Sequence, residues 1–262
     1  MYTDIIYEIL NGNATITVNR PEAKNAFSTL TQREVIDAIG RADADRCVCV
    51  VVLQGAGQTF CAGADIKELS DAGLENPLAI GQLLSLDKAF YDALRNVGKP
   101  VIAKIRGFAV GGGCLTALAC DFRVPAEDAR IGFPFVKIGL SGADGGATYH
   151  LPRLVGYGRA TQLLLSGDLI SGKDAARMGL ATKAVPEANL DDAVNELADL
   201  LKTKSPYALR ETKLALRRSL DLDVASEFHE EQRVTVAGLL GSDWVEGTDA
   251  FKERRAPQFE VR

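Results

Sequence analysis

The chain opens with two short apolar runs that are rich in β-branched residues. They occupy 5–10 and 14–18, and Asn11-Gly12 lies between them. This dipeptide tolerates the positive φ angles of a two-residue turn, so the pattern predicts a β-hairpin.

Further on, apolar runs of strand length alternate with segments of helical pattern. The runs at 47–55 and 100–107 are continuous and typical of strands buried on both faces, and shorter extended pieces lie within 122–134. Between the strands, Thr31 and Glu34 form a capping-box pattern that predicts a helix start, helical material extends to about Val97, and 114–120 forms a short apolar helix. Ser171 and Asp174 repeat the capping-box pattern. This alternation predicts an α/β core with repeated crossovers.

From about Asn189 onward the periodicity becomes helical. The segments 189–205, 207–220 and 224–240 each carry apolar residues three and four positions apart. We therefore predict an α/β core at 1–188 and a helical C-terminal region at 189–262.

Composition narrows the class of function. The 262 residues are 47% apolar and 25% charged, typical of a globular protein, and the net charge of −5 gives no basic surface for nucleic acid. The N-terminus has neither a basic leader nor a long apolar run, so no signal peptide or membrane segment is expected. Five cysteines without a CxxC pair, and only His150 and His229 besides, indicate no zinc site and reduced thiols in a cytoplasm.

Two glycine-rich loops carry the candidate chemistry. FCAGADIKE at 60–68 follows one strand, and GFAVGGGC at 107–114 follows another and precedes an apolar helix. Small residues let a ligand approach the backbone, and the N–H groups at a helix N-terminus are unpaired and lie at its positive end. Each loop alone could be a mere turn, but together they can hold a developing oxyanion between two donors.

The two loops, in this order and spacing, resemble the signature of the crotonase (enoyl-CoA hydratase/isomerase) superfamily. Four further segments share the resemblance: 19–28, 139–156, 166–186 and 251–259. It implies a spiral of ββα units with a C-terminal helical trimerisation region, assembled as homotrimers or as hexamers built from two trimers. It also implies an acyl-CoA thioester substrate and no cofactor other than the coenzyme A that the substrate carries.

The resemblance assigns roles to particular residues. The oxyanion-hole N–H groups would be those of Ala62 and Gly112. Residues expected to contact the substrate are Lys24, Ala26, Gly63, Ala64, Asp65, Ile66, Leu115, Phe135, Phe251 and Lys252. Phe251 and Lys252 match positions that in the family contact the nucleotide end, in some members across subunits.

The positions at which hydratases of this family carry two catalytic glutamates hold Leu115 and Phe135. Neither side chain can transfer a proton, so the two-glutamate mechanism of hydration is not expected, and both side chains would fill an acyl pocket. The remaining acid nearby is Asp144. It is either the catalytic base or the N-cap of the helix that follows. Asp65 is a weaker candidate acid.

These observations predict an acyl-CoA enzyme that stabilises an enolate, with a Δ3,Δ2-enoyl-CoA isomerase as the leading hypothesis, since one base suffices for that double-bond shift. Hydrolysis, retro-Claisen cleavage or decarboxylation of a CoA thioester would use the same oxyanion hole. A non-catalytic acyl-CoA-binding protein is the third interpretation.

Overall fold

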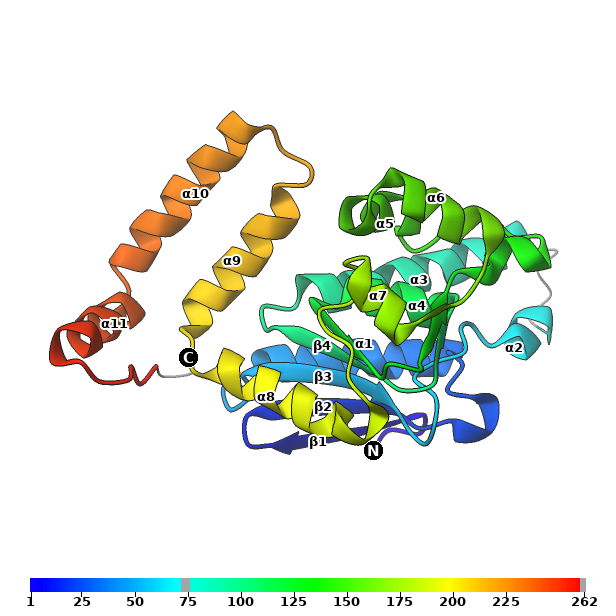
Figure 1. Cartoon of the computed structure of the whole chain (residues 1–262), viewed down its shortest axis with the longest axis horizontal. Coiled ribbons are helices and arrows are strands. Elements are labelled where there is room, and N and C mark those ends of the chain that lie inside the picture. The colour runs from blue at the N-terminus through cyan, green and yellow to red at the C-terminus, as the bar shows by residue number, and fades with distance from the viewer. Residues whose placement is uncertain (72–75, 260–262) are drawn as a thin grey trace.

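Two β-sheets form the centre of the protein in the computed structural model, which describes residues 1–71 and 76–259 (Figure 1). The larger, five-stranded sheet has the order β1-β2-β3-β4-β6, and the smaller, three-stranded sheet has the order β5-β7-β8. Their strands are β1 (Ile5–Leu10), β2 (Asn13–Val18), β3 (Val50–Gly55), β4 (Val101–Ile105), β5 (Phe108–Val110), β6 (Phe122–Pro125), β7 (Arg130–Gly132) and β8 (Ile170–Ser171).

Most of the helices pack around these sheets. They are α1 (Thr29–Ala44), α2 (Ile66–Asp71), α3 (Pro77–Asn96), α4 (Gly112–Ala119), α5 (Ala147–Val155), α6 (Tyr157–Ser166), α7 (Gly172–Arg177) and α8 (Leu190–Lys202), followed by α9 (Pro206–Arg218), α10 (Val224–Leu239) and α11 (Ser242–Glu253). Short 3₁₀ turns lie at Pro21–Ala23, Pro134–Ile138 and Glu187–Asn189. Parts of two predicted helical segments, 72–75 and 260–262, lie outside the described residues.

The chain alternates between the two sheets and so generates a spiral. β4 joins the large sheet, β5 joins the small sheet, and α4 follows; β6 and β7 repeat the pattern before α5. An earlier turn follows β3, where Cys61 makes an isolated parallel bridge to Ala109 of β5. The predicted α/β class, with repeated ββα units, is confirmed.

The elements predicted from local sequence are present, with one error at a helix start. The hairpin turns at Asn11 (φ 51°) and Gly12 (φ 79°) as expected. However, α1 is capped by Ser28, which forms a capping box with Thr31, so the predicted box of Thr31 with Glu34 is wrong. The Glu34 carboxylate instead accepts the backbone N–H groups at the start of the chain.

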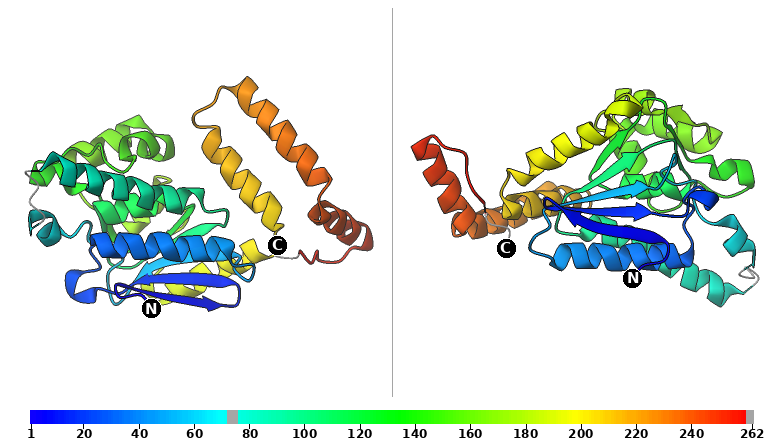
Figure 2. Two further views of the ribbon diagram at one scale, coloured as in Figure 1. Left: turned by 180° about the vertical axis from the view of Figure 1, so that it is seen from behind. Right: turned by 90° about the horizontal axis from the view of Figure 1, so that it is seen from below.

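The C-terminal part is helical, as predicted. α8 packs across β3, β4 and β6, whereas α9, α10 and α11 extend away from the sheets as an arm (Figures 1 and 2). In the described part of the chain, no helix combines the length and the apolar character needed to span a bilayer.

Candidate active site

The structure brings the two glycine-rich loops side by side. The Cys61 N–H donates to the Phe108 carbonyl oxygen at 2.9 Å, and the Val110 N–H donates to the Cys61 carbonyl oxygen at 3.0 Å. The first loop therefore runs as a neighbour of β5, and the second loop continues from β5 into α4.

The Ala62 N–H is not available to a ligand, because it donates to the Lys24 carbonyl oxygen at 3.1 Å. The predicted oxyanion role of Ala62 is therefore wrong in this structure. Two residues later, Ala64 N lies against Gly112, since a β-carbon built on Gly112 would lie 3.4 Å from it. Among the described residues, neither the Ala64 N–H nor the Gly112 N–H donates to a protein acceptor.

Backbone conformation makes this pair of donors possible. Gly63 has φ +114° and Gly111 has φ +55°, values that residues with a side chain rarely adopt. Gly112 is the first residue of α4, so its N–H is one of those a helix leaves unpaired, at the positive end of the helix. Ala64 is exposed and Gly112 half-buried, so a ligand oxygen can reach both. Two N–H groups so placed can stabilise a thioester enolate oxygen.

The segment at 24–27 supports the first loop along its other side. The Phe27 N–H donates to the Gly63 carbonyl oxygen, and the Asp65 N–H donates to the Phe27 carbonyl oxygen. Lys24 is exposed and Ala26 is buried there, so the structure places both beside the predicted substrate stretch 62–66.

Fully buried Asn25 fixes this segment by donating to the carbonyl oxygens of Ala56 and Thr59. This role of Asn25 was not predicted from the sequence.

The Asp65 carboxylate forms an ion pair with Arg20. Its carboxylate accepts from Arg20 at 2.9 Å, and the same guanidinium donates to the Ala26 carbonyl oxygen. Burial alone would raise the pKa of Asp65, but the Arg20 bond and charge and the backbone N–H groups of Lys67 and Glu68 outweigh it and lower that pKa. Asp65 thus holds the loop in place.

The two side chains at the expected glutamate positions form apolar walls. Leu115 is fully buried in α4, and Phe135 is 9% exposed. Phe135 lies 3.8 Å from a β-carbon built on Gly111, next to the donor loop. A β-carbon on Gly145 would meet Leu115 Cδ1 at 2.8 Å, so the loop that carries Asp144 packs directly on Leu115.

Asp144 does not cap a helix with its side chain. The N-cap of α5 is Gly146, which makes no side-chain cap, and only the backbone carbonyl of Asp144 accepts from Ala147. The N-cap alternative is therefore wrong. Half-buried Asp144 instead lines a cavity of about 430 Å³ together with Asp87 and Tyr91 of α3.

Sequence reasoning missed Asp87 and Tyr91. They lie four residues apart, so they share a face of α3, and a β-carbon on Gly145 would lie 3.0 Å from Tyr91 Cε2. Burial, and next the charges of Asp144 and Asp87, raise the pKa of Tyr91 well above its usual value, so its hydroxyl stays protonated. The sequence signal that could have identified Asp87 and Tyr91 is their four-residue spacing on a helix whose residues Phe90 and Leu94 are buried.

Two other kinds of reactive side chain are inert here. Burial raises the pKa of the Cys61 thiol to about 12 and also raises that of Cys114, so neither is a thiolate nucleophile at neutral pH. Burial, together with nearby arginines, lowers the pKa of His150 to about 4, so it is neutral and packs against Tyr149.

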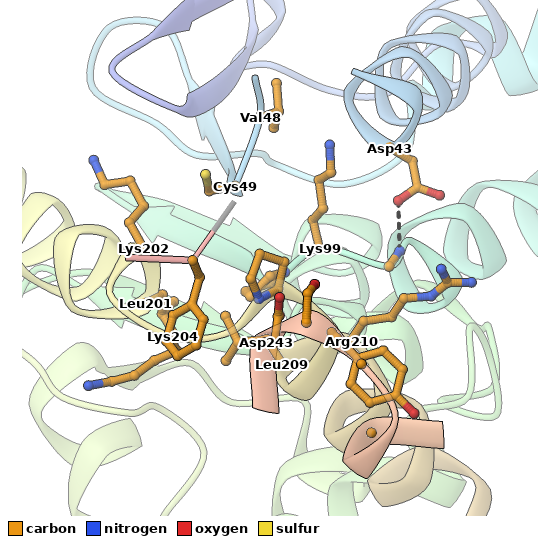
Figure 3. Close-up of a pocket in the computed structure, with 18 residues that line it drawn as sticks. Asp43, Val48, Cys49, Lys99, Leu201, Lys202, Lys204, Leu209, Arg210 and Asp243 are labelled. Carbon is orange, nitrogen blue, oxygen red and sulfur yellow. Dashed lines mark hydrogen bonds between the residues drawn. The ribbon is translucent and has the colours of Figure 1, made fainter. Parts of the chain in front are cut away.

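A separate cavity of about 360 Å³ lies where the arm joins the core (Figure 3). Two of its charged groups already have partners: the Lys99 ammonium donates to the carbonyl oxygens of Ala42 and Asp45, and Asp43 accepts from the Gly98 N–H, the dashed contact in the figure. We interpret this cavity as a structural joint.

The remaining predicted contacts are not gathered at this site. Ile66 is 65% exposed at the start of α2, next to the donor loop. Phe251 is 85% exposed, and Lys252 pairs with Asp249, on α11. Figure 1 shows α11 and α2 at opposite ends of the molecule. Phe251 and Lys252 can therefore meet a ligand at these loops only if the loops belong to another copy of the chain.

Comparisons with known proteins identify the family to which the chain belongs. The model of the enoyl-CoA hydratase/isomerase family matches residues 8–262. The chain is 35% identical over 259 residues to a crotonyl-CoA hydratase of Syntrophomonas wolfei, covering 98% of both chains. It is 34% identical over 253 residues to a short-chain-enoyl-CoA hydratase of Clostridium acetobutylicum, covering 96% of this chain and 95% of the relative.

Solved structures give the same result at the level of the fold. An enoyl-CoA hydratase from Bacillus anthracis superposes with a TM-score of 0.93 at 31% identity, covering 99% of this chain and all of the other. One from Polaromonas sp. JS666 superposes with a TM-score of 0.93 at 29% identity, covering 97% and 99%. The chain has the α/β crotonase fold with C-terminal helices and belongs to the enoyl-CoA hydratase/isomerase family of acyl-CoA enzymes.

Proposed function

We propose that this protein shifts the double bond of a 3-enoyl-CoA thioester to the 2-position, through an enolate held by the N–H groups of Ala64 and Gly112. The observation that carries the proposal is this pair of unpaired donors, one of them at the start of α4. Such donors stabilise negative charge on a thioester oxygen as it develops. Coenzyme A enters as part of the substrate, and no other cofactor is proposed.

Asp144 is the proposed proton carrier. It removes a proton from C2, the electron pair of the broken C–H bond moves toward the thioester oxygen, and the enolate collapses as C4 gains a proton and the double bond moves from C3–C4 to C2–C3. In the simplest scheme the same carboxylate returns the proton. The support is that the Asp144 side chain is not used as a helix cap, and that the next residue, Gly145, packs on Leu115, which lies three residues after Gly112 in α4.

Hydration, the activity in the names of the two relatives above, fits the residues present less well. Adding water to a 2-enoyl-CoA requires a base for the water and an acid for the carbon. Leu115 and Phe135 occupy the positions where the family resemblance expects those groups. We expect hydration of crotonyl-CoA to be at least ~10²-fold slower than in a dedicated hydratase.

Changing Asp144 to Asn tests the proposal. The variant preserves the shape of the side chain and removes the proton carrier, so turnover of a 3-enoyl-CoA should fall by ~10²-fold or more, with unchanged thermal stability and CoA affinity. Asp92→Asn is the matched control, because Asp92 lines the same cavity but pairs with Lys88. Absorbance of the conjugated thioester measures turnover.

Three results would contradict the proposal. Full isomerase activity in the Asp144→Asn variant would show that Asp144 is not the base. A wild-type protein that converts no 3-enoyl-CoA but releases free carboxylate or CO₂ from a CoA thioester would favour hydrolysis, retro-Claisen cleavage or decarboxylation. Binding of acyl-CoA without any turnover would indicate the non-catalytic alternative.

A further inference from the structure

A buried glutamine next to the cavity that Asp144 lines uses only one of its two polar ends. Gln32 of α1 is 7% exposed, and its Nε2 donates to Oδ1 of Asp87 on α3. Its amide oxygen is buried and has no partner among the described residues. Leaving a buried acceptor unpaired destabilises the fold, so this arrangement requires an explanation.

Asp87 joins Gln32 to the cavity that contains Asp144. Asp87 lies one helical turn before Tyr91. Asp87, Tyr91 and Asp144 line the same cavity of about 430 Å³. Burial raises the pKa of Asp87; the Gln32 hydrogen bond opposes this, and the negative charge of Asp144 raises it further. Asp87 therefore binds a proton at a higher pH than an ordinary aspartate.

Other charged groups also border this cavity, but among the described residues none of them forms an ion pair with Asp87. Lys88 forms its ion pair with Asp92, one turn further along α3. The groups that line the cavity around Asp87 and can carry charge are Lys88, Tyr91, Asp92, Arg95 and Asp144.

A glutamine suits a carboxylate that gains and loses a proton. An arginine or lysine would stabilise only the ionised form, since neither can accept a hydrogen bond. The amide of Gln32 offers N–H to the carboxylate, as observed, and after a half-turn of the amide its oxygen accepts from the neutral acid. The unpaired oxygen is then the acceptor that the protonated form of Asp87 requires.

We propose that Asp87 is a second proton carrier of this cavity, held in both protonation states by Gln32, and that it delivers the proton to C4 while Asp144 removes the proton from C2. This inference rests on the proposed function and extends its simplest scheme.

The proton balance closes over one turnover. The C2–H bond breaks and its proton moves to Asp144, the O–H bond of Asp87 breaks as a C4–H bond forms, and the double bond moves to C2–C3. Transfer of one proton from Asp144 to Asp87 within the cavity then restores the starting state. No oxidant, reductant or other reactant is needed.

The test combines three measurements on the full chain. Infrared titration should show one protonated carboxyl band that persists above the ordinary range of aspartate; the band should be absent in Asp87→Asn and retained in Asp92→Asn. Turnover of a 3-enoyl-CoA should fall by ~10²-fold or more in Asp87→Asn. Exchange of the C2 hydrogens of a saturated acyl-CoA with D₂O needs only Asp144 and the N–H pair, so it should persist in Asp87→Asn and be lost in Asp144→Asn.

A Gln32→Met variant keeps the test decisive if Asp87→Asn does not fold. Its carboxyl band should titrate at higher pH, because the ionised Asp87 loses its N–H donor, and the pH profile of turnover should shift with it. An unchanged band and profile in Gln32→Met, or full turnover in Asp87→Asn, would overturn the role of Asp87. If C2 exchange persists in both aspartate variants, this result would instead count against the proposed function. The infrared band would still decide whether Asp87 carries the proton.

Discussion

Gly112 and Gly113 follow each other at the start of α4, but a β-carbon would meet different surroundings at the two positions. At Gly112 it would lie 3.4 Å from Ala64 N, an ordinary contact that places a methyl group in front of the proposed donors. At Gly113 it would lie 2.4 Å from the Cys61 carbonyl oxygen, which forces the two loops apart.

We therefore expect opposite effects from two alanine substitutions. Gly112→Ala should retain its thermal stability and lose turnover by ~10²-fold or more, because the oxyanion no longer reaches both N–H groups. Gly113→Ala should lose about 1–3 kcal/mol of unfolding free energy through overpacking. Urea denaturation and the isomerase assay measure the two quantities. Full turnover in a folded Gly112→Ala protein would exclude the N–H pair as the oxyanion site.

At the scale of elements, Arg20 ties the segment before α1 to the first glycine-rich loop through Asp65 and the Ala26 carbonyl oxygen. Arg20→Met should cost about 1.5–3 kcal/mol at pH 7, the range for hydrogen bonds to charged groups. The pKa of Asp65 is lowered in the folded state. Its contribution is therefore fully present above the unfolded value of ~3.9 and is lost as pH falls through the folded value.

The stability difference between wild type and Arg20→Met should accordingly be constant near neutral pH and narrow below pH ~4. Urea denaturation at several pH values measures it. Arg177→Met is a suitable control, because the pair of Arg177 with Asp174 is exposed and should contribute no more than ~1 kcal/mol. A difference that grows toward acid pH would show that Arg20 does not act through the Asp65 carboxylate.

Elements defined by short-range chemistry could be predicted from the sequence. Asn11-Gly12 encodes its turn within two residues, and the ββα order follows from the spacing of apolar runs. The start of α1 was missed because Glu34 bonds to the backbone of Thr3 and Asp4, some thirty positions away. The local pattern assigned the Glu34 side chain to a helix cap, but it bonds instead to residues that are distant in the sequence.

The same limit applies to the site. The two loops were predictable as a pair, but the choice between Ala62 and Ala64 depends on which N–H group the Lys24 carbonyl occupies. Likewise, Asp87 becomes a candidate only when α3 packs beside the loop of Asp144. Such roles arise from packing between distant segments, which periodicity and motif spacing do not encode.

At the scale of the whole molecule, the arm leaves a large apolar surface without a partner in a single copy. A groove of about 900 Å³ runs between α9, α10 and α11. Exposed large apolar side chains on and between these helices are Leu216, Leu220, Leu222, Val224, Phe228, Val236, Leu239, Leu240, Trp244, Val245 and Phe251. Soluble monomers rarely expose such a contiguous surface, so a protein partner is expected there.

The arm is anchored firmly enough to present this surface in one direction. Lys213 of α9, which is 8% exposed, pairs with Asp121 at 2.7 Å and donates to the Lys99 carbonyl oxygen, and Arg217 pairs with the other oxygen of Asp121. A fixed arm on each copy suits a closed ring of identical subunits. We expect such an assembly to bring Phe251 and Lys252 to the loops of a neighbouring copy.

We accordingly predict a trimer or a hexamer in solution, with the arm forming much of the interface. A Phe228→Glu/Leu240→Glu variant should shift light-scattering mass toward the monomer while its circular dichroism stays unchanged, because two buried carboxylates would face an apolar interface. Leu10→Glu, on the equally exposed hairpin, should not alter the mass. If Phe251 and Lys252 contact the nucleotide end of a neighbour's substrate, the arm variant should also bind CoA more weakly. A wild-type protein that is monomeric at micromolar concentration would contradict the predicted assembly. It would also contradict the contacts of Phe251 and Lys252 across subunits.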